Sequence, residues 1–482
     1  MGIVVNQSIK NVIITCLGFV IGAMNTLFLF TKFLDEEYYG LISYLFSASN
    51  LIWPLMAFGV HNTLIKFYSA YLDKGQQNKF LSMMLLLPLC MALILGTIGV
   101  VLYSYILDFF ATENSIVQPY VWTIYVLAIT LSYFEIFFTW AKVKLKSVFG
   151  NIMKELFARL CLMILLFLVY LKIITVQQFI YAIVIVYILR FCIMMLYALR
   201  LHNFRFSFSF PNNYISVFKY SLLILLAGSV ATLLIDLDKT MIERYLPIAS
   251  VAKYSICAYI ASVIIIPSRA MHQITYPLTA KLINEKGWDP LRELYKKSSL
   301  NLFAISGLLF VLIICNVHQL FELIPDKYEL YIWVVLLIGV AKLFDNLLGN
   351  NNAILFNSDY YRLILYIGII MAILAFVFNW ICIPVFGVAG AAMATFIAVF
   401  CYNLMKLWIV NTKFSMHPFS KKTVLILLLI SVFGFGFYFW DFQFHPILSI
   451  ILKSLILSIC YVALLYFFKI SSDINTIIKR MI

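Results

Sequence analysis

Polar side chains recur at helical spacing along several long apolar segments of this 482-residue chain. In residues 41–66, Ser47 and Asn50 share one helical face with Ser43 and His61. Such a face can bind a polar ligand within an apolar environment, or it can simply allow helices to pack closely through small residues. Comparable faces carry Asn11, Thr15, Gly18, Gly22 and Asn25; Ser221, Gly228, Thr232 and Lys239; and Ser255, Ser262 and Arg269. The recurrence favours a shared hydrophilic cavity, with Ser47, Asn50, Asn25, Lys239 and Ser262 as candidate ligand contacts.

Two arginines interrupt apolar segments, where an isolated charge is costly. Arg269 has no acid within four residues on either side, and His272 follows it by three residues. A guanidinium can bind phosphate oxygens bidentately, so Arg269 and His272 are candidate contacts for an anionic group. The alternative for Arg269 is that it extends toward the aqueous interface. Arg159 either contacts the same anionic group or forms an internal ion pair with Glu155 or Glu135.

Acids inside apolar segments are candidates for coupling transport to a cation. Glu135 and Asp345 are the clear examples away from the segment ends. Lys342 precedes Asp345 by three residues, so a neutralising ion pair is the expected role of Asp345. Glu135 is therefore the candidate ion-coupling residue.

The sequence lacks the motifs of common enzymes and metal sites. It contains no GxxxxGK[ST], HExxH or GxSxG motif, so nucleotide-driven pumping and hydrolytic catalysis are not expected. The nine cysteines lie in apolar stretches without a CxxC motif or a Cys/His cluster. We therefore expect a protein that is not an enzyme and has no metal site or cofactor.

The composition is that of a multi-pass membrane protein. Hydrophobic residues make up 64% and charged residues 12% of the chain, and the mean hydropathy is +1.00, whereas soluble domains contain about 25% charged residues. Apolar windows predict an all-α polytopic membrane protein with about fourteen transmembrane helices. The predicted spans cover roughly 11–33, 41–66, 80–107, 118–140, 152–171, 177–199, 215–236, 249–270, 299–319, 328–348, 361–382, 386–408, 422–440 and 446–468.

The net charge of +14 is distributed asymmetrically among the loops. The loop at 35–37 is acidic, the next loop contains Lys66, Lys74 and Lys79, and lysine and arginine continue to gather in even-numbered loops and at both ends. This distribution follows the positive-inside rule and predicts that both termini are cytoplasmic. It also explains the basic balance without nucleic acid as a partner.

A weak internal repeat spans about six helices, with residues 39–44 echoed by 254–259. Because six is even, both copies would enter the membrane from the same side, as in alternating-access transporters. The expected organisation is two pseudo-symmetric six-helix lobes, residues 1–207 and 208–411, followed by two extra helices in residues 412–482.

Several local motifs resemble the polysaccharide-export branch of the multidrug/oligosaccharidyl-lipid/polysaccharide exporter superfamily, the Wzx-type O-antigen flippases. The resemblance rests on Tyr39-Gly40, Gly59 and Lys66, on Asp238-Lys239 followed by residues 252–255, and on Asn379 before residues 383–395. The last string, Ile-Pro-Val-Phe-Gly-Val-Ala-Gly-Ala-Ala-Met-Ala-Thr, is the most specific. Lys66 stands where the family commonly has arginine.

The resemblance implies a flippase for an undecaprenyl-diphosphate-linked oligosaccharide in the bacterial inner membrane, where an O-antigen, capsule or exopolysaccharide repeat unit crosses to the periplasmic leaflet. It implies membrane lipids, a glycan polymerase and chain-length machinery as partners. The alternative is a cation-coupled drug or metabolite antiporter of the same superfamily. Sodium-coupled members resemble one another in carrying a carboxylate in the first span, but residues 11–33 contain neither Asp nor Glu.

Overall fold

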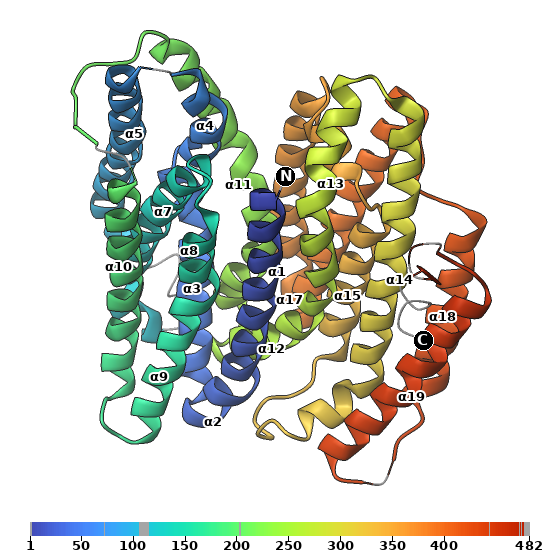
Figure 1. Ribbon diagram of the computed structural model, residues 1–482. Helices are drawn as coiled ribbons and strands as arrows, with labels where there is room; N and C mark the ends of the chain where they lie inside the picture. Colours follow the sequence, from blue (N-terminus) through green and yellow to red (C-terminus); the bar gives the residue numbers. More distant parts are fainter. Residues whose placement is uncertain are drawn as a thin grey trace. The chain divides into compact units, whose positions relative to one another are not determined.

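The computed structural model describes residues 2–71, 73–105, 115–201, 204–442, 444–471, 473 and 475–476 (Figure 1). Within these ranges the regular structure is helical throughout and contains no β-strand, which confirms the all-α prediction. The chain forms two compact units. The first unit comprises residues 1–255 and 379–387, and the second comprises residues 256–378 and 388–482.

Long apolar helices build the first unit, and charged or glycine-containing segments interrupt several of them. Its elements are α1 (Gly2–Ala23), η1 (Met24–Leu29), α2 (Phe30–Phe33), α3 (Glu36–Met56), α4 (Val60–Phe67), η2 (Tyr68–Ala70), α5 (Lys74–Val101), η3 (Ser115–Tyr120), α7 (Val121–Val143), α8 (Ser147–Ile152), η4 (Met153–Phe157), α9 (Ala158–Tyr170), α10 (Val176–Arg200) and α11 (Tyr214–Tyr245). Helix α3 packs along α7 and α11, and α7 packs along α10. The core between them is aromatic and includes Phe80, Phe134, Phe138 and Trp140.

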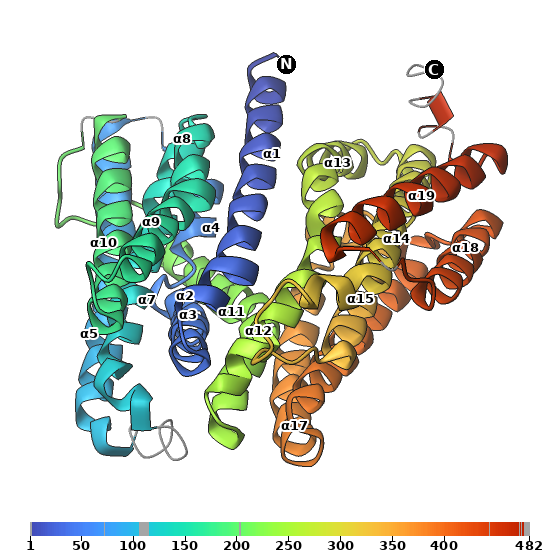
Figure 2. The ribbon, with the colours of Figure 1, turned by 90° about the horizontal axis from the view of Figure 1, so that it is seen from below.

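The second unit is arranged around the long helix α14. Helix α12 (Ala249–Ser262) leads into it, followed by η5 (Val263–Ile265), α13 (Ile266–Asn284), α14 (Trp288–Phe321), α15 (Ile332–Leu347), α16 (Asn351–Phe356), α17 (Tyr361–Phe414), α18 (Lys421–Tyr438) and α19 (Pro446–Phe467). Helices α13, α15, α18 and α19 all pack against α14. Figures 1 and 2 both place α18 and α19 beside it. At Gly307 of α14, an added Cβ would lie 2.4 Å from the end of the Ile430 side chain of α18, so glycine allows the two helices to pack closely without displacing that side chain.

Each predicted span coincides with a helix. Among the described residues, nine helices are long and apolar enough to cross a membrane, or ten if α3 and α4, which meet at 45°, form one span. The remaining expected spans coincide with helices that are interrupted, short or fused. The π-helical turn η4 divides the span at 152–171, α15 has 16 residues, and α17 contains two expected spans that meet at Gly387, where φ is 58°.

Two boundaries differ from the prediction for physical reasons. Helix α11 continues to Tyr245, whereas the hydropathy window ended at 236. The window stopped there because Asp236 and Asp238 are charged, yet both are buried within the helix. The second expected span is broken between Met56 and Val60, where Gly59 adopts φ of 66°.

The compact units do not follow the expected lobe boundaries at 207 and 411. Because α11 packs along α3 and α4, residues 208–255 belong to the first unit. The lobe boundaries derive from the repeat of transmembrane spans in the sequence, whereas the compact units reflect which residues pack together. The lobe boundaries therefore stay a prediction.

Candidate functional site

A buried carboxylate, Asp236 of α11, collects three polar side chains in the first unit. Ser47 Oγ donates to Asp236 Oδ1 at 3.2 Å, and Asn50 Nδ2 donates to Oδ2 at 3.2 Å. Lys239 Nζ lies 3.6 Å from Oδ1. Ser47 is about 16 Å along α3 from Glu36, and Asp236 is about 14 Å along α11 from Tyr245, so both helices put the cluster deep within a membrane-spanning length.

This cluster brings together three of the predicted site residues, Ser47, Asn50 and Lys239, around an acid that the sequence reading missed. The polar face of α3 thus serves helix packing on α11. Gly228 and Thr232, which were expected on the same face as Lys239, have side chains outside the described part of the structure. The signal for Asp236 was its three-residue spacing from Lys239, which places the two side chains on one helical face.

The ends of the same helices are joined by a second set of polar contacts. Lys253 Nζ lies 3.8 Å from Glu36 Oε2, and Tyr254 donates a hydrogen bond to Asp238. A Cβ on Gly40 would lie 2.0 Å from the Ile248 carbonyl oxygen, so only glycine permits this approach of the two backbones. The resemblance motifs at 39–40, 238–239 and 252–255 therefore meet in one place.

Arg159 forms the ion pair that was one of its two predicted roles. Arg159 Nη2 lies 3.3 Å from Glu155 Oε2 on the preceding turn. Asn25 Nδ2 donates to the Arg159 carbonyl oxygen at 2.8 Å, and a Cβ on Gly18 would lie 2.8 Å from Arg159 Nη1. Asn25 of η1 and Arg159 of α9 thus hold these two helical segments together. Ligand contact by either residue stays a prediction.

Glu135, the ion-coupling candidate, forms an ion pair with Lys154 of η4. The π-helical turn that carries Lys154 and Glu155 therefore presents one residue to α7 and keeps the other beside Arg159. A π-turn inserts a residue into the helix and often marks a functional position. Ion coupling by Glu135 stays a prediction.

Arg190 is a membrane-depth cation that the sequence reading overlooked. It is buried, lies about 15 Å along α10 from Arg200, and stacks on the Phe134 ring with 3.9 Å from the guanidinium carbon to the ring centroid. An arginine in the middle of an apolar span was the available signal. The positive charge in this region is larger than the negative charge by one. It comes from Lys154, Arg159 and Arg190, and the negative charge comes from Glu135 and Glu155.

In the second unit, Arg269 and His272 lie on α13. Arg269 is exposed and lies about 22 Å along the helix from Asn284. His272 is half-buried, with its ring centroid 5.2 Å from that of Tyr276. Ser262 Oγ donates to the Tyr259 carbonyl oxygen at 2.7 Å, so its hydroxyl bonds within its own helix turn.

Asp345 is ion-paired, but the partner in the structure differs from the expected one. Lys406 Nζ of α17 lies 3.6 Å from Asp345 Oδ1, whereas Lys342 had been expected from local spacing. Lys406 also donates to Asn352 Oδ1 at 2.9 Å. Sequence spacing could not identify this pair because the two residues are joined only by tertiary packing.

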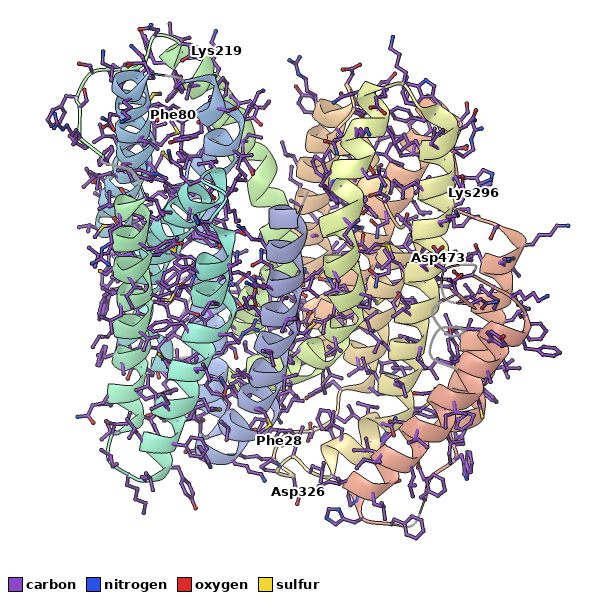
Figure 3. The ribbon with its side chains drawn as sticks, viewed as in Figure 1. Phe28, Phe80, Lys219, Lys296, Asp326 and Asp473 are labelled. Carbon is purple, nitrogen blue, oxygen red and sulfur yellow. The ribbon has the colours of Figure 1, made fainter. Side chains whose placement is uncertain are left out.

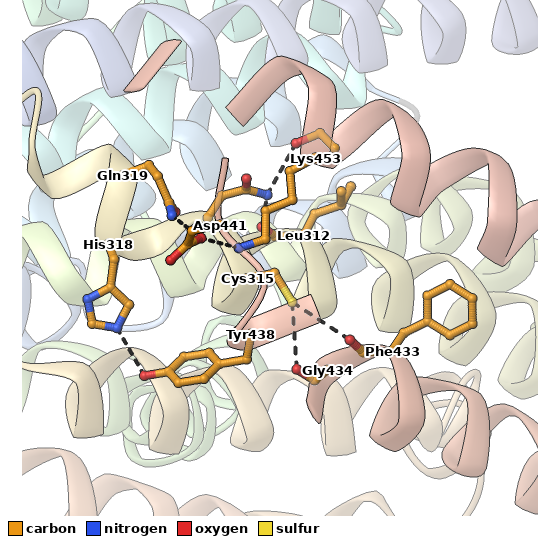
Figure 4. A network of polar contacts seen from close by, with 11 residues as sticks. Leu312, Cys315, His318, Gln319, Phe433, Gly434, Tyr438, Asp441 and Lys453 are labelled. Carbon is orange, nitrogen blue, oxygen red and sulfur yellow. Dashed lines mark hydrogen bonds and ion pairs between the residues drawn. The ribbon is translucent and has the colours of Figure 1, made fainter. Parts of the chain in front are cut away.

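A further polar network ties α18 and α19 to α14 (Figure 4). Lys453 Nζ lies 2.7 Å from Asp441 Oδ1, and the Lys453 side chain is fully buried. Gln319 also donates to Asp441, while His318 Nε2 and the Tyr438 hydroxyl are 2.9 Å apart. The network satisfies a buried ammonium and thereby anchors the two C-terminal helices.

The structure offers no metal centre in its described part, where no group of three or more His, Cys, Asp or Glu residues could hold an ion.

At one end of the first unit a pocket of about 280 Å³ is lined by Ile65, Tyr68, Ser69, Lys142, Val143 and Leu145. Nearby, outside the spanning segments, burial raises the pKa of Tyr71 and its hydrogen bond with Asn213 opposes the rise. Tyr71 therefore keeps its hydroxyl proton at neutral pH and donates a hydrogen bond to Asn213 Oδ1.

Comparison with known proteins gives a family and a fold. Residues 8–283 match the model of a family described as polysaccharide biosynthesis protein, whereas no curated protein matches the chain. The structure is similar to that of the lipid II flippase MurJ in an inward closed conformation, with a TM-score of 0.71 and 14% identity over 96% of this chain and 100% of that chain.

Two MATE transporters share the fold with lower TM-scores. An inward-facing multidrug resistance MATE family transporter of the MOP superfamily has a TM-score of 0.64 and 14% identity over 85% of this chain and 98% of that chain. A Vibrio cholerae MATE transporter, VcmN, has a TM-score of 0.54 and 11% identity over 86% and 99%. The fold is thus that of the MOP exporter superfamily.

Proposed function

Because the chain belongs to the polysaccharide biosynthesis protein family, we propose that it is a flippase for an undecaprenyl-diphosphate-linked oligosaccharide. It moves an O-antigen, capsule or exopolysaccharide repeat unit from the cytoplasmic to the periplasmic leaflet of the bacterial inner membrane by alternating access. The lipid tail remains in the bilayer while the diphosphate and sugars pass through a hydrated interior. A glycan polymerase and chain-length machinery receive the product.

The observation that carries this proposal is Arg269, an exposed arginine at membrane depth. It lies about 24 Å along the chain of α12, η5 and α13 from Lys253, within a hydrocarbon layer about 30 Å thick. An exposed guanidinium at that depth favours a hydrated passage beside α13, since contact of a charge with lipid tails is costly. A diphosphate has the charge and the geometry for a bidentate contact.

The orientation follows from the loop charges. In the first unit, Lys219 and Phe80 lie at one end and Phe28 at the other (Figure 3). In the second unit, Lys296 lies toward one end and Asp326 at the opposite end (Figure 3). The lysine-rich ends are cytoplasmic, with both termini. Arg269 then lies near the middle of its span, about 22 Å from the cytoplasmic end of α13 at Asn284, where a substrate synthesised on the cytoplasmic side would reach it through the passage.

A cation-coupled drug antiporter is the competing function. The MATE-like fold is compatible with it, but Glu135, Asp236 and Asp345 each have an ammonium partner in the structure. A carboxylate whose charge is already neutralised attracts a second cation less strongly. The ion pairs thus support the flippase over a carboxylate-driven antiporter.

Export of surface glycan by Arg269 variants tests the proposal. In a strain deleted for the gene, Arg269→Ala and Arg269→Glu are expected to abolish export at matched membrane abundance, and Arg269→Lys to restore it in part. Lys281→Ala, an exposed position on the same helix, is the control and retains export. Normal export by the Glu variant, or loss of drug resistance with intact surface glycan, would contradict the proposal.

A further inference from the structure

Six polar and aromatic side chains from α13, α15, α16 and α17 gather within the second unit. They are His272, Tyr276, Asp345, Asn352, Tyr402 and Lys406. Lys406 is central, because its Nζ lies 3.6 Å from Asp345, 2.9 Å from Asn352 Oδ1 and 4.4 Å from the Tyr402 ring centroid. The Lys406 side chain is 3% exposed, whereas that of Asp345 is 29% exposed, so the carboxylate retains an open face.

The aromatic members lie on helices beside this carboxylate. Lys406 contacts both Asp345 and the Tyr402 ring, while His272 and Tyr276 lie on α13, which packs against α16, the helix of Asn352. All three rings are half-buried. Tyr276 and His272 pack edge to face, with centroids 5.2 Å apart. Each of the three side chains is therefore partly covered by protein and partly accessible.

The cluster lies at a defined depth. Tyr276 is about 12 Å along α13 from Asn284, and Lys406 is about 12 Å along α17 from Phe414. Arg269 lies on the same face of α13, about 10 Å deeper than Tyr276. The aromatic and carboxylate groups thus adjoin the proposed diphosphate contact on its cytoplasmic side.

A tight turn between α15 and α16 positions Asn352 within the cluster. Gly349 has φ of 55°, and an added Cβ would lie 2.5 Å from the Ser299 backbone nitrogen. Two consecutive asparagines then reach different helices: Asn350 donates to Thr279 of α13, and Asn351 donates to the Tyr295 hydroxyl of α14 at 3.0 Å. Asn352, next in the chain, is fixed in turn by Lys406.

We infer that this cluster binds the sugar ring nearest the diphosphate. Aromatic faces attract the weakly positive C–H groups of a pyranose, and the carboxylate, amide and imidazole offer the acceptors and donors that sugar hydroxyls need. Lys406 orients Asp345 and Asn352 and does not itself contact the sugar. The assignment rests on the proposed function, because it gives the oligosaccharide part of that substrate its binding groups.

Binding of defined lipids to the purified full-length protein tests this assignment. The probes are undecaprenyl diphosphate without sugar and the same lipid carrying glucose, galactose, N-acetylglucosamine or N-acetylgalactosamine. The wild type is expected to bind at least one sugar-bearing lipid about tenfold more tightly than the sugarless lipid. The reason is that a tenfold difference in affinity corresponds to about 1.4 kcal/mol, which a ring stacked on an aromatic face can contribute. Tyr402→Leu removes this advantage and leaves affinity for the sugarless lipid unchanged.

Two further variants complete the comparison. Tyr366→Leu, at a side chain 62% exposed on the same helix α17, is the matched control and keeps the sugar preference. If Tyr402→Leu is unstable, Tyr276→Leu tests the same prediction at another ring of the cluster. Equal binding of sugarless and all sugar-bearing lipids by the wild type overturns the sugar site but not the flippase. Failure of the wild type to bind any of these lipids overturns both.

Discussion

Asp236 is the residue on which the polar interior of the first unit depends. Its side chain is 12% exposed, accepts hydrogen bonds from Ser47 and Asn50, and forms an ion pair with Lys239. Asp236→Ala would leave a largely buried ammonium and two donors without their acceptor, which costs about 1–3 kcal/mol of stability. We expect a lower thermal unfolding temperature in detergent for Asp236→Ala than for the control Asp289→Ala, whose side chain is 91% exposed. Equal unfolding temperatures would show that the cluster contributes nothing to stability.

A double-mutant cycle distinguishes the two possible roles of Arg159, the ion pair with Glu155 and contact with a ligand. If the ion pair is the main role of Arg159, Arg159→Ala lowers membrane abundance, Arg159→Lys retains full export, and removal of Glu155 as well restores part of the loss. A coupling energy of about 0.5–3 kcal/mol between the two substitutions is expected, measured by chemical unfolding. Loss of export by Arg159→Ala at normal abundance would instead indicate contact with the substrate.

The sequence predicted the polar faces better than it predicted their partners. Ser47, Asn50 and Lys239 were visible through helical spacing, but Asp236, which they share, was taken as the end of a span because its charge lowers mean hydropathy. Asp345 was correctly expected to be neutralised. Its partner, Lys406, lies on a helix that local spacing cannot reach.

At the scale of elements, hydropathy located the helices but not their interruptions. A window average does not respond to Gly59, where φ of 66° separates α3 from α4, or to the π-turn η4. Both interruptions lie where other helices make contact, since α4 packs against α11 and η4 packs against α1. The two spans that the weak repeat relates are both interrupted near a proline, Pro54 in one and Pro267 in the other.

Gly59 is the element-scale position with the sharpest expected response. A Cβ there would lie 2.5 Å from the Ser221 carbonyl oxygen, and the left-handed conformation alone costs an L-residue about 1–2 kcal/mol. Gly59→Ala is therefore expected to lower the unfolding temperature. Gly99→Ala is the control, because nothing lies within 4 Å of an added Cβ at that helical position. A destabilisation confined to Gly99→Ala would contradict the assignment of the break.

At the scale of the whole molecule, the charge distribution predicts the orientation in the membrane. Reporter fusions after Lys146 are expected to report a cytoplasmic position, and fusions after Glu113, which lies outside the described residues, a periplasmic one. The reason is that lysine and arginine gather in the even-numbered loops. The reverse pair of readings would exclude the proposed orientation and, with it, access to Arg269 from the side where the substrate is synthesised.

Translocation by the purified protein in liposomes tests the central claim most directly. The substrate is the lipid-linked oligosaccharide that accumulates in the deletion strain, and its exposure is followed by oxidation with membrane-impermeant periodate. The account predicts that wild-type protein renders nearly all of the lipid oxidisable. With Arg269→Glu or without protein, only the fraction already in the outer leaflet should react. Translocation by Arg269→Glu at the wild-type rate, or failure of the wild-type protein to translocate this lipid, would contradict it.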